Sequence, residues 1–386
     1  MYSLLGLLAA LGCAQSALAA PLASPPNSSY IDWRTFKGNG VNLGGWLEQE
    51  STIDSLFWDK YSGGASDEWG LCEHLGSQCG PVLEHRYATW ITKADIDKLA
   101  SGGITVLRIP TTYAAWIDLP SSQLYSGNQT AYLKEIADYA IKTYNMHIII
   151  DTHSLPGGVN GLTIGEATGH WYWFYNETNF NYSMQVIDQV INFIQTSGSP
   201  QSYTLEPINE PADNNTNMVV FGTPLALTDH GAAWVLKYIR AVIQKVASVN
   251  PNIPVMFQGS FKYPQYWEGD FPASTNLVFD THHYYYEHMD STSENLPEYI
   301  LADAREKSGT GKFPVFVGEW AIQATYNNTF ALRKRNVLAG LDIWQSYSQG
   351  SAYWTAKFTG NTSVDGQGEQ KDYWCYETFI DEGYFN

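Results

Sequence analysis

Short apolar runs alternate with amphipathic stretches along the chain from residue 39 onward. Several of the apolar runs are continuous and rich in β-branched residues, which is typical of parallel strands buried on both faces. We predict strands at residues 40–47, 105–110, 147–151, 203–207, 255–258, 277–280, 315–318 and 352–354. The stretches between them have helical periodicity and predict helices at residues 93–100, 131–144, 184–195, 232–248, 298–307 and 332–347. Thr92 predicts a cap at the start of the first of these helices.

This order of strands and helices, with no repeat or low-complexity break, predicts a protein of the α/β class with a single closed (β/α)8 (TIM) barrel. We assign residues 20–386 to that one domain. Two long stretches without a helical pattern, residues 48–84 and 155–180, follow the first and third predicted strands. In such a barrel they lie on the C-terminal face, where these folds carry their active sites.

The beginning of the chain predicts export from the cell. Residues 4–18 are almost wholly apolar and uncharged, and they end in the small-residue pattern Ala17-Leu18-Ala19. This pattern is typical of a signal peptide, which we place at residues 1–19, with the mature protein extracellular or in the cell wall. The run is too short to span a membrane. Residues 380–386 are acidic and aromatic, unlike a lipid-anchor signal. We therefore expect no membrane association.

Glycosylation signals and cysteines fit the same compartment. Asn-x-Ser/Thr sequons, which suit a secreted glycoprotein, begin at Asn27, Asn128, Asn176, Asn181, Asn214, Asn327 and Asn361. Cys13 lies in the predicted signal peptide, which leaves Cys72, Cys79 and Cys375 and allows at most one disulfide within the chain. A bond between Cys72 and Cys79 would close a short loop. A bond from either of them to Cys375 would join the two ends of the chain.

The charge and the aromatic content narrow the class of ligand. The formal net charge is −18, from 39 acidic and 21 basic residues, so the surface repels phosphate backbones and nucleic acid is excluded as a partner. The chain also has 14 Trp and 26 Tyr. Many of these residues will pack in the core, but such a content also suits a cleft that stacks the flat apolar faces of sugars.

Polar and aromatic residues gather just after the predicted strands. In a (β/α)8 barrel these positions point into the mouth of the active site. They are occupied by Glu50, Arg108, His153, Asn209, Glu210, His282, Tyr284, Glu319 and Trp354. A purely structural barrel has no need for so many polar groups at one end, so we predict that these residues form the site.

Several of these residues lie in motifs that resemble glycoside hydrolase family 5. Asn209-Glu210-Pro211 follows the fourth predicted strand, and Glu319-Trp320 follows the seventh. Further similar stretches are residues 40–46, 107–110, 151–157 and 282–284, which resemble the fungal glucanase branch of the family. The resemblance extends over residues 33–360 and implies that the barrel is the catalytic domain of a retaining β-glycosidase.

The resemblance also implies a role for each carboxylate. Glu210 is expected to be the acid/base, and Glu319 the nucleophile that forms a covalent glycosyl-enzyme, which requires carboxyls about 5–5.5 Å apart. The nearness of Glu319 and a dry pocket would raise the pKa of Glu210. Arg108 and Tyr284 are expected to donate hydrogen bonds that keep Glu319 ionised.

The remaining predicted site residues are expected to hold the sugar. Asn209 would bond its 2-hydroxyl, and His153 and His282 would orient the acid/base or bond other hydroxyls. Trp354 would form the floor of the subsite for the transferred sugar, and Glu50 would hold hydroxyls of that same ring.

Structural alternatives remain open for several of these residues. Arg108 also fits a plain salt bridge, and His153 and Trp354 also fit core packing. Glu50 is flanked by Glu48 and Ser51, where similar fungal glucanases carry an apolar residue and a proline.

The sequence also contains potential metal ligands. The cluster His283, Glu287 and His288 contains potential ligands, but the chain has neither His-Glu-x-x-His nor suitably spaced cysteines. We expect no metal and no cofactor.

The substrate prediction depends on the long loops. Residues 67–72, 76–81 and 165–171 resemble those of the fungal glucan endo-1,6-β-glucosidases. We therefore expect a monomeric enzyme that cleaves β-1,6-glucan polysaccharide or oligosaccharide internally. An exo-acting β-1,3-glucanase is the alternative, and an inactive glucan-binding protein of the cell wall is a third interpretation.

Overall fold

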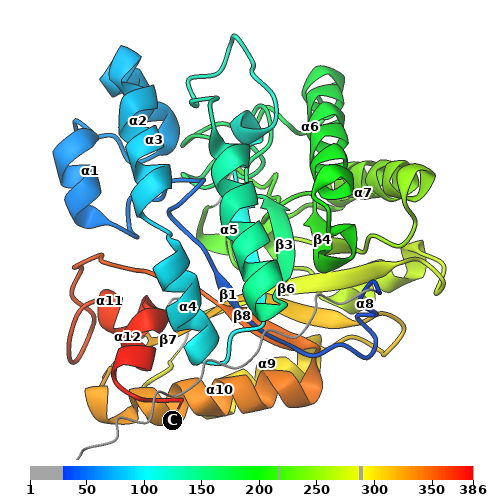
Figure 1. Cartoon of the computed structure of the whole chain (residues 1–386). Coiled ribbons are helices and arrows are strands. Elements are labelled where there is room, and N and C mark those ends of the chain that lie inside the picture. Colours follow the sequence, from blue (N-terminus) through cyan, green and yellow to red (C-terminus); the bar gives the residue numbers. More distant parts are fainter. Residues whose placement is uncertain (1–28, 216–217, 287–289, 386) are drawn as a thin grey trace, which may run out of the picture.

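The computed structural model describes residues 29–215, 218–286 and 290–385. In this part of the chain, parallel strands pair in sequence order and β1 closes on β8, so the sheet forms a barrel (Figure 1). The strands are β1 Gly38–Asn42, β2 Val106–Thr111, β3 His147–Thr152, β4 Tyr203–Glu206, β5 Val255–Gln258, β6 Leu277–Tyr285, β7 Val315–Ala324 and β8 Gly350–Tyr353. The predicted (β/α)8 barrel is confirmed. The predicted signal peptide lies outside the described residues.

The predicted strand bounds are wrong at three functional ends. β1 ends at Asn42 rather than at residue 47, because the chain turns away from the barrel after it. β6 and β7 run on to Tyr285 and Ala324, well beyond the predicted ends at residues 280 and 318. Polar residues such as His282 and Glu319 ended the apolar pattern, although the strands continue through them.

All six predicted helices are present, and they surround the barrel in Figure 1. They are α4 Lys93–Ser101, α5 Gln129–Tyr144, α6 Glu177–Thr196, α7 Asp229–Val249, α9 Leu296–Lys307 and α10 Arg333–Tyr347. Thr92 caps α4 as predicted, in a capping box with Asp95. No helix in the described ranges is both long enough and apolar enough to cross a membrane.

The prediction of a non-helical insertion at residues 48–84 is wrong. It contains α1 Ser55–Tyr61, α2 Glu68–Leu75 and η1 Gly76–Gln78, and α3 Cys79–Thr89 begins near its end. The buried faces of α2 and α3 include Glu68 and Arg86, so the apolar periodicity that would reveal these helices is interrupted. Cys72 and Cys79 form a disulfide across the α2–α3 turn, and Cys375 is a buried free thiol.

The second predicted insertion is non-helical up to Asn176, where α6 is capped. The short helices in the rest of the described chain are η2 Tyr113–Ala115, η3 Pro200–Ser202, η4 Met218–Val220, η5 Pro224–Ala226, α8 Pro264–Trp267, η6 Glu268–Asp270, η7 Phe330–Leu332, α11 Lys371–Trp374 and α12 Tyr376–Asp381.

The lower part of the barrel interior is an apolar plug. It is formed by inward residues of six strands together with Trp33, namely Val106, Ile149, Met256, Val278, Phe316 and Ala352. Since side chains on a strand alternate between its two faces, the residues two positions further along point into the barrel above this plug. Those positions begin the candidate site.

Candidate active site

A layer of buried charges lies directly above the apolar plug. Arg108 stands two residues after Val106, and Asp280 stands two residues after Val278. Asp151 is placed likewise on β3, and Glu206 on β4 is also fully buried. These acidic residues were not predicted as site residues. An acidic residue at an inward position of an otherwise apolar strand is the sequence signal that would have revealed them.

Arg108 connects this layer to the strand ends. Its guanidinium is fully buried and donates from Nε to Glu206 Oε2 at 2.8 Å. From Nη1 it reaches Glu319 Oε1 at 2.8 Å, and from Nη2 it reaches Asn209 Oδ1 at 2.9 Å and Asp151 Oδ2 at 3.1 Å. Burial alone would lower the pKa of Arg108, but the surrounding carboxylates outweigh it and raise the pKa well above its usual range. The cation is therefore permanent.

Glu319 enters the barrel mouth through an irregularity in β7. The register with β6 shifts around Gly318, so that Glu319 lies opposite His282. A side chain at Gly318 would collide with the carboxylate of Asp280, which accepts a hydrogen bond from the Gly318 amide. Glycine at this position thus permits the close approach that turns Glu319 inward.

Donors reach both oxygens of Glu319. Arg108 contacts Oε1, and the Tyr284 hydroxyl donates to Oε2 at 2.6 Å. His282 Nδ1 lies 3.5 Å from Oε2. Burial raises the pKa of Tyr284 well above its usual range, and the negative charge of Glu319 adds to this, so the phenol stays a donor.

Glu210 lies beyond the end of β4 on a left-handed backbone with φ 45°. This conformation is uncommon for a residue with a side chain and is typical of functional positions. Gln258 stabilises it by accepting a hydrogen bond from the Glu210 amide at 2.9 Å. The Glu210 carboxyl contacts His282 Nδ1 at 2.7 Å through Oε1.

The two candidate carboxyls are close together. One oxygen of Glu210 and one of Glu319 lie within 4.8 Å of each other and of an imidazole nitrogen of His282. Burial raises the pKa of Glu210 and Glu319 raises it further, whereas His282 opposes the shift. Burial alone would lower the pKa of His282, but Glu319 and Asp280 outweigh it and raise the pKa well above the usual value.

His153, Asn209 and Trp354 lie on the neighbouring side of the mouth. His153 contacts Asp151 Oδ2 through Nδ1 at 2.6 Å and Asn209 Nδ2 through Nε2 at 3.2 Å. Its ring lies parallel to Trp354, with the centroids 5.9 Å apart. Asn209 is fully buried, with both ends of its amide engaged by Arg108 and His153.

A cavity of about 690 Å³ opens over these groups. It reaches Glu50, His153, Glu210, His282, Tyr284, Glu319 and Trp354, which are seven of the nine predicted site residues. Arg108 and Asn209 lie beneath it. The size is typical of pockets that enclose a ligand of two or more rings.

The cavity has two different walls. Beyond β4 and β5 it is lined by Phe221 and Phe261, whose rings pack edge to face 4.9 Å apart. On the side of β1 and β8 it is lined by Glu50, Gln370 and Trp374. Only Glu50 of these five was predicted, because the others follow the strand ends at longer distances along the chain.

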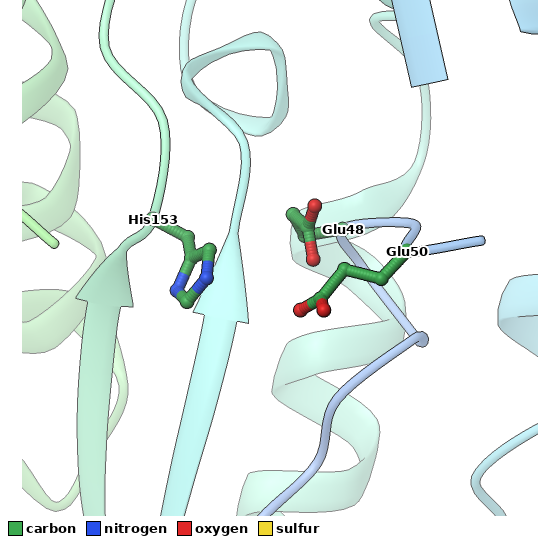
Figure 2. A group of neighbouring side chains, drawn as sticks. All are labelled: Glu48, Glu50 and His153. Atoms are coloured by element: carbon green, nitrogen blue, oxygen red, sulfur yellow. The ribbon is translucent and has the colours of Figure 1, made fainter. Parts of the chain in front are cut away.

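Glu48 and Glu50 lie side by side after β1, and Figure 2 shows their carboxylates facing the His153 ring. One ligand atom from each of these three residues lies within 4.8 Å of the others. Glu48 is only 2% exposed, at a position where similar glucanases carry an apolar residue.

The donor sets at the mouth fit a hydrogen-bonding network better than a metal. Glu206, Asp280 and His282 form a second cluster with ligand atoms within 4.8 Å, and the Glu210 cluster is a third. The oxygens of Glu319 accept from Arg108 and Tyr284, and both nitrogens of His282 contact carboxylates. In the cluster of Glu210, His282 and Glu319, these hydrogen bonds engage most of the atoms that an ion would need. The His283 ring stacks on Trp344, and residues 287 and 288 lie outside the described chain.

A (β/α)8 barrel with two close carboxyls above β4 and on β7 is the architecture of a glycoside hydrolase. The model of the family described as Cellulase (glycosyl hydrolase family 5) matches residues 76–360. The chain belongs to glycosyl hydrolase family 5.

Individual relatives add detail. The chain is 29% identical to a probable glucan 1,3-beta-glucosidase A of Aspergillus niger, over 81% of this chain and 72% of that one. Among solved structures it is similar to rutinosidase from Aspergillus niger, with 96% identity, TM-score 0.92, and coverage of 93% of this chain and 100% of that chain. It is also similar to the protein called AoRut, with 74% identity, TM-score 0.91, and coverage of 92% and 98%.

Proposed function

We propose that this enzyme is a rutinosidase, which hydrolyses glycosides of the disaccharide rutinose. The proposal is carried by the 96% identity to the Aspergillus niger rutinosidase over the whole of that chain. At this level of identity, few residues differ between the two chains. A different substrate preference would require several of those differences to lie in the pocket.

The paired carboxyls support a retaining mechanism in two steps. Glu319 attacks the anomeric carbon while Glu210 donates its proton to the oxygen of the leaving group, which gives a covalent glycosyl-enzyme. Glu210 then takes a proton from water, the water oxygen attacks the same carbon, and Glu319 leaves. An oxygen separation within 4.8 Å suits this route, because inversion needs room for a water between the carboxyls.

The surrounding groups support these roles. Donors on both oxygens of Glu319 favour its ionised form, and the raised pKa of Glu210 favours the protonated form that an acid requires. His282 positions the Glu210 carboxyl through the 2.7 Å contact. Asn209 was expected to reach a sugar hydroxyl. Its amide positions Arg108 and His153, and the second N–H of Nδ2 can still donate to that hydroxyl.

The cavity walls fit a sugar on one side and an aromatic leaving group on the other. The leaving group lies beside the acid, and the nearby Phe221–Phe261 pair offers it aromatic faces. The transferred sugar lies beside Glu319, where Trp354, Glu50 and Gln370 offer one indole face and polar groups. This division suits a glycoside with a flat aglycone.

Exo-acting β-1,3-glucosidase is the second candidate. It is supported by the Aspergillus niger relative and by a glucan 1,3-beta-glucosidase of Schizosaccharomyces pombe, which is 26% identical over 76% of this chain. The endo-β-1,6-glucanase prediction stays untested, and the relatives described above bear other names.

A substrate panel separates these candidates. Purified enzyme is assayed on p-nitrophenyl β-rutinoside, p-nitrophenyl β-glucoside, laminarin and the β-1,6-glucan pustulan. We expect intact rutinose from the first substrate, at a kcat/KM well above that for the glucoside. Glucose released from laminarin as the main activity would favour the β-1,3 candidate. Oligosaccharides from pustulan would favour the β-1,6 candidate, and inactivity on all four would favour the glucan-binding protein.

We also propose that the enzyme is secreted and N-glycosylated. The apolar run at residues 4–18 supports export. The sequon asparagines in the described chain lie at exposed or partly exposed positions. Expression in a yeast host should release the protein into the medium, with a mass that falls on treatment with an N-glycosidase.

A further inference from the structure

Three carboxyls meet behind the wall that faces the transferred sugar. Glu48 and Glu68 are each 2% exposed, and Glu50 next to them lines the cavity. Figure 2 shows the carboxylates of Glu48 and Glu50 next to each other on the segment after β1. The Glu68 carboxylate accepts from the Gln49 amide at 2.8 Å, which fixes α2 against the same segment.

The cationic influence nearest to this cluster comes from His153. Across the described residues, no Lys or Arg forms an ion pair with Glu48, Glu50 or Glu68. Each of the three keeps one buried oxygen without a hydrogen-bond partner, Oε2 in Glu48 and Oε1 in the other two. The oxygens of Glu48 and Glu50 that lie nearest His153 are within 4.8 Å of each other. Two buried carboxyls this close do not both ionise, so they retain a proton.

We propose that Glu48 is a positioning residue for Glu50: the pair keeps at least one proton, so that Glu50 offers the bound sugar an O–H donor as well as an acceptor oxygen. A sugar hydroxyl both donates and accepts, and a half-protonated pair matches it better than two carboxylates would. An apolar residue in place of Glu48 would leave Glu50 to titrate without a neighbouring carboxyl.

Burial and the neighbouring charges favour protonated carboxyls in the pair. Burial raises the pKa of Glu50 to about 8, His153 and Arg108 lower it, and Glu319 and Glu210 raise it. Burial also raises the pKa of Glu48 well above its usual value, with further contributions from Glu50, Glu68, Asp151 and Glu319. A proton therefore stays on the pair throughout the acid and neutral range.

The test measures KM and kcat against pH, from about pH 5 to about pH 9, which brackets the titration of the pair. The substrates are p-nitrophenyl β-rutinoside and p-nitrophenyl β-glucoside. In wild type, KM should be flat and then rise above about pH 8, by up to about tenfold per pH unit. In Glu48→Gln the rise should begin about one pH unit lower, with kcat at its plateau unchanged. In Glu50→Gln, KM should not depend on pH.

Glu68→Gln is the matched control, because it removes a carboxylate from the same cluster without touching the pair. Glu68→Gln should shift the pH midpoint of the rise in KM by less than half as much as Glu48→Gln does. Circular dichroism should show that all three variants fold. The inference is overturned if wild-type KM is flat, if the Glu48→Gln and wild-type midpoints coincide, or if Glu68→Gln shifts the midpoint equally. The inference rests on the proposed function only in assuming that a sugar occupies the pocket. The assay with the glucoside therefore tests the inference even if rutinoside is not the preferred substrate.

Discussion

Glu319 is fixed in the barrel mouth by one strong donor on each oxygen. Arg108 donates at 2.8 Å and Tyr284 at 2.6 Å, and Arg108 is fully buried whereas Tyr284 is partly buried. The guanidinium cannot move without breaking its bonds to Asp151 and Glu206. Removal of a donor should therefore slow the chemical steps more than it weakens substrate binding, because the donors hold Glu319 in position and stabilise the negative charge that returns to it when the glycosyl-enzyme is hydrolysed.

Tyr284→Phe tests this assignment. We expect kcat to fall by about 10²-fold, as for loss of one preorganised donor, while KM changes little. Tyr285→Phe is the matched control, because Tyr285 follows on the same strand and packs outside the barrel mouth. Equal kcat values for Tyr284→Phe and wild type would contradict the role of this hydrogen bond.

Glu210→Gln tests the acid. With a poor leaving group the rate should fall by roughly 10²–10⁴-fold, the usual contribution of general acid catalysis. With a 2,4-dinitrophenyl glycoside, whose leaving group needs no proton, glycosylation of the enzyme should be nearly as fast as in wild type. Pre-steady-state release of dinitrophenol measures this step, and the same loss on both substrates would exclude Glu210 as the acid.

The residues that we propose carry the chemistry were predictable because they end or follow strands in recognisable motifs. The buried layer of Asp151, Glu206 and Asp280 was missed, since within apolar strands these residues look like isolated exceptions. Only the alternation above the plug shows that they point inward. The role of Gly318 could not be predicted from the sequence either, because it depends on a contact with a neighbouring strand.

At the scale of elements, two insertions build the cavity wall and hold each other. Asp67 caps α2 through a hydrogen bond from the Gly70 amide at 2.7 Å. Its other oxygen accepts from the Thr168 amide at 3.0 Å, in the loop after β3. Thr168 lines the cavity, so one aspartate couples a helix of the first insertion to the wall formed by the second.

Asp67→Ala should therefore affect both stability and substrate binding. Loss of the cap costs about 1 kcal/mol, and release of the loop should raise KM several-fold with a smaller change in kcat. Hydrogen exchange should increase at residues 162–170. Thr92→Ala removes a cap from α4 on the outer ring at a similar cost, and its KM should stay at the wild-type value. An unchanged KM in Asp67→Ala would show that this contact does not shape the pocket.

Helices α1 to α3 could not be predicted from apolar periodicity, because their stability comes from buried polar contacts. Arg86 of α3 donates to Asp54 at 2.6 Å and to the Gly45 carbonyl at 2.9 Å. The outer helices, by contrast, bury mainly apolar faces, as α7 does, although α10 also buries Arg333 and Asn336. The sequence therefore identifies helices that pack by hydrophobic burial and misses those that pack through ion pairs.

At the scale of the whole molecule, buried acids should make stability depend on pH. Burial raises the pKa values of Glu50 and Glu68 to about 8 in the folded state. Since the ordinary value is near 4.5, the unfolded chain ionises first. The folded state should therefore lose stability as pH rises from about 4.5 to about 8 and then level off.

Thermal unfolding measures this dependence. Tm should be higher near pH 5 than near pH 8, and Glu68→Gln should reduce the difference because it removes one of the titrating groups. A Tm that increases across this range would contradict the assignment of protonated buried acids.

The fold was predictable as a whole because eight apolar runs in a fixed order permit few arrangements other than a closed barrel. The substrate preference was not, because it depends on loops such as residues 155–176, 207–215 and 218–228, whose conformation comes from contacts with other loops. The Phe221–Phe261 pair joins loops after two different strands, and no local pattern in the sequence predicts this contact.

The central claim is that Glu319 forms a covalent bond to the sugar. Wild-type enzyme is incubated with 2,4-dinitrophenyl 2-deoxy-2-fluoro-β-glucoside, whose glycosyl-enzyme turns over slowly, and is then digested and analysed by mass spectrometry. We predict one fluoroglucosyl adduct, on the peptide that contains Glu319, with activity recovering as the adduct is released. An adduct on Glu210 or Glu50, or inactivation without any adduct, would contradict the account.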